Sequence, residues 1–130
     1  MAKVEKRVLV VDDEVPVLDL MEDILTEAKF SVARAGNAKE TFSILHEEHI
    51  QVMFIDLNLP EVTGIDICKQ IREDNPIAFI YAITGHIDTF DVFDCRHFGF
   101  DDFFEKPFSP KDIVRAAKDA FRKLKRWNHD

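Results

Sequence analysis

The 130-residue sequence has only two cysteines, Cys68 and Cys95, and neither belongs to a CxxC pair or has a histidine at metal-ligand spacing. This pattern favours space-filling thiols in a reducing compartment over a disulfide framework or a zinc site. No apolar run approaches the roughly 20 residues that a membrane-spanning helix needs. Internal repeats, low-complexity segments and linker-like stretches are also missing. These absences favour one globular domain, residues 1–130, in the cytoplasm, with no membrane contact.

Positive charge is scarce outside the C-terminal segment. Residues 111–130 carry seven Lys or Arg against three Asp, so a net charge of −8 for the chain leaves −12 on residues 1–110. Such an acidic body argues against direct nucleic-acid binding. The basic segment can be either a docking surface or a solvated helix face. Residues 1–6 are charged and lead straight into an apolar run, so no signal peptide is expected.

Short apolar runs alternate with amphipathic segments along the whole chain. We predict strands at 7–11, 30–35, 51–55, 78–83 and 101–105, and helices near 15–28, 38–48, 63–74, 87–97 and 110–126. This alternation is typical of βαβ units, whose right-handed crossovers place helices on both faces of a parallel sheet. The expected fold is α/β: a three-layer, doubly wound, five-stranded parallel sheet of the flavodoxin-like type. Strand order 2-1-3-4-5 is one of the common orders for such a sheet.

Polar side chains follow four of the predicted strands at the points where the strands end. Asp12 and Asp13 follow the first strand, Asp56 the third, Thr84 the fourth and Lys106 the fifth. Open α/β sheets bind ligands at the edge where the carboxyl ends of their strands meet, so we expect these five side chains to converge. Three carboxylates, a hydroxyl and an ammonium suit a divalent cation and a phosphoryl group.

Each of these side chains also has an ordinary explanation when it is considered alone. The Asp12-Asp13 pair can cap the following helix, Asp56 can cap a helix from a surface loop, and Thr84 can simply end a strand. Two carboxylates about 4–5 Å apart, however, repel by a few kcal/mol at an effective dielectric constant near 20, and Mg²⁺ would supply the counter-charge. Asp56 ends a nearly continuous apolar run, where burying an unpaired carboxylate costs free energy. A carboxylate in such a place can act as a covalent acceptor of a phosphoryl group.

The chain resembles the receiver domains of two-component response regulators, especially the stand-alone chemotaxis and sporulation-relay types, over nearly its whole length. Four motifs carry the resemblance: Val11-Asp12-Asp13-Glu14, Asp56-Leu57-Asn58-Leu59-Pro60, Thr84-Gly85 and Phe103-Phe104-Glu105-Lys106-Pro107-Phe108. The resemblance implies a phosphoacceptor signalling domain that catalyses only its own phosphorylation and dephosphorylation. Its phosphodonor would be a sensor histidine kinase or a histidine phosphotransfer protein, and its downstream protein target is open.

The resemblance also implies a role for each site residue. Asp56 would be the phosphoacceptor, and Thr84 and Lys106 would hold phosphoryl oxygens. Asp13, Asp56 and the main-chain carbonyl of Asn58 would bind Mg²⁺ (or Mn²⁺), with Asp12 assisting through water. The Lys106–Pro107 peptide would be cis.

Three more positions follow from the same comparison. Thr84 and Phe103 would form the switch that changes the surface made by residues 87–126. Phe103 lacks the hydroxyl that a tyrosine at this position would offer to water or a partner, and Phe100 and Arg96 depart from the common family pattern. Asn58 and His86 would set the lifetime of the phosphorylated state, although His86 can equally be an exposed residue at a helix start.

Three alternatives remain at this stage. A phosphatase of the haloacid-dehalogenase type also uses Asp, Thr, Lys and an acidic Mg²⁺ pair, but it places a second acid two residues after the nucleophile, where this chain has Asn58. A flavodoxin-like FMN carrier shares the sheet, but the turn at Asp12-Asp13-Glu14 would repel the FMN phosphate. The third alternative is a receiver that is a fragment of a larger regulator.

Overall fold

The structure, a computed structural model, describes residues 6–85 and 92–127. Five parallel strands form one sheet in the order β2-β1-β3-β4-β5, which confirms the predicted fold class and strand order. The strands are β1 Arg7–Val11, β2 Ser31–Ala35, β3 Val52–Asp56, β4 Phe79–Thr84 and β5 Asp102–Glu105. The helices are α1 Val15–Glu27, α2 Ala38–Glu47, α3 Gly64–Asp74, α4 Val92–His97 and α5 Pro110–Trp127. Part of the helix predicted at 87–97 lies outside the described residues.

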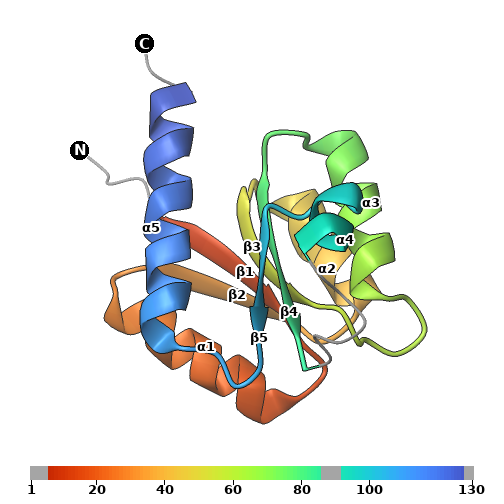
Figure 1. The fold of residues 1–130 in the computed structure, drawn as a ribbon, viewed down its shortest axis with the longest axis horizontal. Coiled ribbons are helices and arrows are strands. Elements are labelled where there is room, and N and C mark those ends of the chain that lie inside the picture. Colours follow the sequence, from red (N-terminus) through yellow and green to blue (C-terminus); the bar gives the residue numbers. More distant parts are fainter. Residues whose placement is uncertain (1–5, 86–91, 128–130) are drawn as a thin grey trace.

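The sheet separates two apolar clusters, which makes the fold a three-layer sandwich (Figure 1). In β1, Leu9 points into the cluster under α2, α3 and α4, whereas Val8 and Val10 point into the cluster under α1 and α5. β3 is divided between the same two clusters and is buried throughout. A parallel sheet covered on both faces needs apolar side chains on both, which is why these strands read as continuous apolar runs.

Local signals in the sequence fix where several helices begin. Asn37 Oδ1 accepts a hydrogen bond from the Glu40 N–H at 2.8 Å at the start of α2, and Glu40 Oε1 accepts one from the Gly36 N–H at 2.6 Å. Thr63 Oγ1 caps α3 in the same way. At the start of α5 the Ser109 carbonyl accepts from the Asp112 N–H at 3.1 Å, and Pro110 is the first helical residue. These bonds satisfy N–H groups that a helix start would otherwise leave unpaired.

Helix α5 packs on the sheet through one apolar side. Its buried residues are Ile113, Ala117, Ala120 and Leu124, as the sequence pattern predicts. Phe121 lies beside them and stacks on Phe30 with ring centroids 5.5 Å apart. The basic side chains of α5 are exposed, so the net positive charge of the C-terminal segment lies on the solvent side of this helix.

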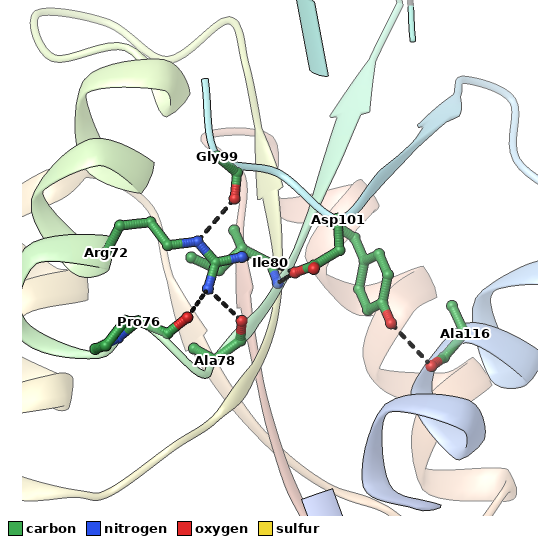
Figure 2. A network of polar contacts seen from close by, with 8 residues as sticks. Arg72, Pro76, Ala78, Ile80, Gly99, Asp101 and Ala116 are labelled. Atoms are coloured by element: carbon green, nitrogen blue, oxygen red, sulfur yellow. Dashed lines mark hydrogen bonds and ion pairs between the residues drawn. The ribbon is translucent and has the colours of Figure 1, made fainter. Parts of the chain in front are cut away.

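At the edge of the sheet remote from the polar strand ends, Arg72 connects three segments (Figure 2). Its guanidinium donates to the carbonyls of Gly99 at 2.8 Å, of Pro76 at 3.0 Å and of Ala78, and it pairs with Asp101 at 2.7 Å. The same Asp101 carboxylate accepts from an N–H at the start of β4. Arg72 thereby joins the C-terminal turn of α3 to the loops that precede β4 and β5.

Both cysteines are buried, Cys68 on α3 and Cys95 on α4, which agrees with the space-filling role expected for them. Burial raises the pKa of each thiol to about 12. Within the described residues, no helix has both the length and the apolar character that crossing a lipid bilayer would require.

Candidate functional site

Three carboxylates converge at the carboxyl edge of the sheet, as predicted. Asp12 and Asp13 directly follow β1 and Asp56 is the last residue of β3; these two strands are neighbours, with Val11 paired to Ile55. Each of the three offers an oxygen within 4.8 Å of the others. Asp12 and Asp56 are buried and Asp13 is exposed. The cluster is therefore open to solvent on one side and enclosed by protein on the other.

Lys106 completes this cluster from the end of β5. Its Nζ lies 3.0 Å from Asp12 Oδ2, 3.5 Å from Asp56 Oδ2 and 3.8 Å from Glu14 Oε1. The main-chain N–H of Lys106 donates to the Thr84 carbonyl at 2.8 Å, and the Lys106–Pro107 peptide is cis. The ammonium is thus held against two buried acids. Glu14 was not among the predicted site residues, although its place beside Asp13 in the sequence was a signal for it.

The environment shifts the pKa of both central groups. Burial raises the pKa of Asp56, and the negative charges of Asp12 and Asp13 raise it further. The hydrogen bond from the Asn58 N–H and the positive charge of Lys106 lower it, but not enough to cancel the rise. Burial lowers the pKa of Lys106, but the adjacent carboxylates of Asp12, Asp56 and Glu14 outweigh it and leave the pKa above its usual value. The Lys106 ammonium is therefore kept charged. For the Asp56 carboxylate, by contrast, the nearby positive charge does not offset the effects of burial and of the neighbouring acids.

The donor set fits a hard divalent cation. Asp12 Oδ1 accepts from the Glu14 N–H at 2.9 Å and Asp56 Oδ1 from the Asn58 N–H at 3.1 Å, so each acid has one oxygen fixed by its own loop. Asp12 Oδ2 is buried without a hydrogen bond of good geometry, even though Lys106 is near. Three carboxylates and one ammonium leave two negative charges. Mg²⁺, which binds carboxylate oxygens together with water and phosphate, matches this deficit.

Gly64 sets the path of the main chain at Asp56, and it was not among the residues predicted from the sequence. A Cβ atom at Gly64 would overlap the Asp56 carbonyl oxygen and lie 2.9 Å from the Cα atom of Leu57. The Gly64 N–H also donates to the Leu57 carbonyl at 3.2 Å, and the Leu57 N–H donates to Ile83 at 3.0 Å. The start of α3 therefore packs directly on the end of β3. The Thr63-Gly64 step, a helix cap followed by a glycine, is the signal that could have identified it.

The remaining predicted residues differ in how closely they approach the carboxylates. Thr84 is buried at the end of β4, opposite Glu105 in the sheet register. Asn58 is exposed and contacts Asp56 through its main-chain N–H. Phe103 is half-buried and packs against the cluster under α2, α3 and α4. His86 lies outside the described residues.

Fold and site together define a phosphoacceptor type of domain, and comparison with known proteins identifies its family. Residues 8–118 match the family described as the response regulator receiver domain, and the chain belongs to this family. This membership decides against the phosphatase and the flavin carrier. Response regulator SaeR of Staphylococcus aureus (strain USA300) is 32% identical over 122 residues, which cover 93% of this chain and 53% of SaeR. The chain thus spans about half the length of the curated relatives it matches.

Solved structures agree with this assignment. A response regulator receiver domain protein from Clostridium thermocellum superposes with a TM-score of 0.85 at 26% identity, covering 92% of this chain and 96% of that one. The receiver domain of NtrX from Brucella abortus gives a TM-score of 0.81 at 27% identity, covering 88% and 98%. A CheY-like receiver protein from Methanospirillum hungatei gives a TM-score of 0.87 at 23% identity, covering 96% and 100%, and so shares the fold.

Proposed function

We propose that Asp56 accepts a phosphoryl group from a phosphohistidine of a sensor histidine kinase or a histidine phosphotransfer protein. The observation that carries this proposal is the position of Lys106 Nζ, 3.5 Å from Asp56 Oδ2 and 3.0 Å from Asp12 Oδ2. A buried carboxylate that faces an ammonium and two further acids is suited to receive phosphoryl oxygens and a cation together. The proposal treats residues 1–130 as one receiver domain in the cytoplasm, and this domain does not itself bind nucleic acid.

Because Asp56 Oδ1 is held by the Asn58 N–H, Oδ2 is the oxygen that faces the pocket. In the transfer, an Asp56 carboxylate oxygen forms a bond to phosphorus while the phosphorus–nitrogen bond of the phosphohistidine breaks, and the imidazole keeps the electron pair. Negative charge spreads over the peripheral phosphoryl oxygens, so positioning and charge neutralisation dominate the catalysis. Lys106 and the Thr84 hydroxyl would hold those oxygens.

Asp12, Asp13, Asp56 and the Asn58 carbonyl would hold Mg²⁺, or Mn²⁺ in its place. When bound, this cation supplies positive charge to the phosphoryl oxygens. Water later attacks the phosphorus, the bond to Asp56 breaks, and inorganic phosphate leaves. Asn58 and His86 would tune the lifetime of the phosphorylated state from positions beside the reacting group.

The signal would leave through the face made by α4, β5 and α5. Thr84 moving toward the phosphoryl group would open space for Phe103, which is already half-buried against the neighbouring cluster. Complete burial of a phenylalanine contributes about 1.5–3 kcal/mol, which can shift a poised two-state equilibrium. The altered face would then bind a downstream protein.

The direct test is labelling of the purified chain by acetyl phosphate with and without Mg²⁺, followed by phosphate-affinity electrophoresis and peptide mapping. Wild type should gain a single Mg²⁺-dependent, acid-stable and base-labile phosphate at Asp56. Asp56→Asn should not be labelled, whereas Asp74→Asn, at an exposed carboxylate on α3, should be labelled like wild type. Phosphate on another residue of the Asp56→Asn variant would overturn the assignment.

A second arm tests the cation site. Asp13→Asn removes one acid of the cluster and leaves Lys106 with both of its buried partners. This variant should need a much higher Mg²⁺ concentration for labelling than wild type. An unchanged Mg²⁺ dependence would show that Asp13 does not hold the cation.

A further inference from the structure

A cavity of about 350 Å³ lies at the opposite end of the sheet from the carboxylates, where β4 begins and α5 ends. Its apolar lining includes Ile77, Phe79, Leu124 and Trp127. Trp127 is 75% exposed and Ile77 is 43% exposed, so two large apolar side chains of this lining remain open to solvent. A concave space of this size, mostly apolar with a few polar groups, is typical of small-molecule sites.

Arg72 and Asp101 are the charged members of this lining, and each has one polar group to spare (Figure 2). Arg72 Nη2 carries two N–H groups, and only one of them is used, in the bond to Asp101 Oδ2 at 2.7 Å. Asp101 accepts from Arg72 and from the Ile80 N–H at this same Oδ2. Within residues 6–85 and 92–127, the second Nη2–H of Arg72 and Oδ1 of Asp101 have no hydrogen-bond partner. A donor and an acceptor are therefore left on neighbouring groups.

Positive charge is available beside the cavity. Lys123 Nζ lies 5.9 Å from the centroid of the Phe79 ring, and that ring lines the cavity. None of the ion pairs in the described part of the chain includes Lys123. Because a charged partner strengthens a hydrogen bond, this ammonium favours a ligand that carries an anionic group.

We propose that this cavity binds an adenine nucleotide with one phosphate. The base stacks on the exposed ring of Trp127, as nucleic-acid bases stack on aromatic side chains. A ring nitrogen of adenine accepts from the spare Arg72 Nη2–H, and the adjacent amino group donates to Asp101 Oδ1, since adenine presents an acceptor beside a donor. The phosphate pairs with Lys123.

The combination of groups selects this ligand. A purely apolar ligand would leave the spare donor and acceptor of Arg72 and Asp101 unsatisfied, which costs binding free energy. Inorganic phosphate would use Lys123 but not the apolar lining. A base with a carbonyl in place of the amino group would set an acceptor against the Asp101 carboxylate, and a site built for hydrogen bonding rejects such a mismatch strongly.

The test is a titration of the full chain with adenosine 5′-monophosphate (AMP). Trp127 is the only tryptophan of the chain, so its fluorescence reports on this site alone. AMP should quench this fluorescence saturably, with excitation beyond the absorption band of the purine. Inosine 5′-monophosphate, which has a carbonyl in place of the amino group, should bind at least tenfold more weakly, and so should adenosine, which lacks the phosphate. Isothermal titration calorimetry repeats each measurement without relying on the indole.

Two variants at exposed positions of α5 test the residues without disturbing the core. Trp127→Leu removes the stacking surface and should weaken AMP binding at least tenfold by calorimetry. Lys123→Gln should weaken AMP binding at least tenfold and leave adenosine binding unchanged. Its matched control is Lys125→Gln, the same change at an exposed lysine of the same helix that does not line the cavity, and this variant should bind AMP like wild type. Far-ultraviolet circular dichroism checks that every variant is folded.

The proposal is wrong if AMP shows no saturable binding, if inosine monophosphate binds equally well, or if Trp127→Leu or Lys123→Gln binds AMP like wild type. An equal loss in Lys125→Gln would also overturn it. The cavity shares no residue with the carboxylate site, so Asp56→Asn should bind AMP like wild type. Failure of nucleotide binding and failure of the phosphoacceptor assignment are therefore distinguishable.

Discussion

Gly64 packs directly against the main chain of Asp56, and any side chain at position 64 would overlap the Asp56 carbonyl oxygen. The first residue of α3 thus fixes the last residue of β3. This contact is steric and involves none of the acidic or basic side chains of the site. It determines where the Asp56 carboxylate stands relative to Lys106.

Gly64→Ala should both destabilise the domain and impair labelling of Asp56. The added methyl group meets main-chain atoms, which cannot move aside cheaply, so we expect a loss of about 1–3 kcal/mol in the free energy of unfolding. Urea denaturation measures this loss. Gly85→Ala is the control, because a Cβ atom there meets nothing within 4 Å. Equal stability losses in the two variants would show that the contact with Asp56 is unimportant.

Asp56→Asn should stabilise the metal-free domain at neutral pH by about 1–3 kcal/mol, because it removes a buried carboxylate that lacks full compensation. The raised pKa of Asp56 gives the pH dependence its sign. A folded state that binds the proton more tightly than the unfolded state is favoured below the unfolded pKa, and this advantage is lost as the pH rises through the folded pKa. The difference between Asn and Asp should therefore shrink as the pH falls toward 4.

Urea denaturation of wild type and Asp56→Asn in a chelator, repeated from pH 7.5 downward, tests this expectation. Asp74→Asn, at an exposed position, should show no comparable gain. A constant difference between Asp56→Asn and wild type across the whole range would contradict the assigned shift.

Phe103→Ala should abolish the change in the α4–β5–α5 face without impairing the phosphorylation of Asp56. The labelling of Asp56 should stay close to wild type, since Phe103 packs against the apolar cluster and the carboxylates lie elsewhere. The phosphorylation-dependent change in the α4–β5–α5 face should disappear. Amide hydrogen exchange with and without beryllium fluoride measures this change. An unaltered response in the variant would rule out the switch.

Arg72→Met should lower the free energy of unfolding by about 2–4 kcal/mol. It keeps much of the side-chain volume but leaves Asp101 and three carbonyls without their common donor (Figure 2). Thermal or urea denaturation measures the loss. Arg126→Met, at an exposed site on α5, is the control and should change the stability little. Similar losses in both variants would mean that the network contributes nothing specific.

Cys68 and Cys95 should resist thiol reagents in the folded protein. Burial raises the pKa of both thiols from 9.0 to about 12, so the reactive thiolate form is scarce at pH 8. Labelling by a chromogenic disulfide at pH 8 should be slow in buffer and rapid in urea. Rapid labelling of the folded chain would show that at least one of the thiols is accessible.

The pattern of apolar and amphipathic segments was sufficient to predict the arrangement of strands and helices. Continuous apolar runs alternating with amphipathic segments predicted the parallel sheet, because strands covered on both faces need apolar side chains on both. The Asn37 and Ser109-Pro110 signals placed helix starts to within a residue. The first strand matched at both ends. The other four strands begin one residue later than predicted and two of them, β3 and β4, also end one residue later, since pairing with the neighbouring strand decides where the ladder starts and stops and the local pattern does not.

The site was predicted to a similar depth. The sequence predicted that four side chains converge, because the carboxyl ends of parallel strands lie at one edge of the sheet: Asp12, Asp13, Asp56 and Lys106. Glu14 and Gly64 were not identified, since the reach of a lysine side chain and the fit of a helix start against a strand depend on atomic positions.

The amino-acid sequence by itself determined the order of elements, the sheet edge that carries the chemistry and the residue types available there, because these follow from periodicity and chain topology. Only the tertiary structure decided which carboxylate oxygens remain for a cation, and how Arg72 on α3 reaches Gly99 and Asp101 in the loop before β5. Those features depend on distances of a few ångströms between segments far apart in the chain, which pattern and composition do not specify.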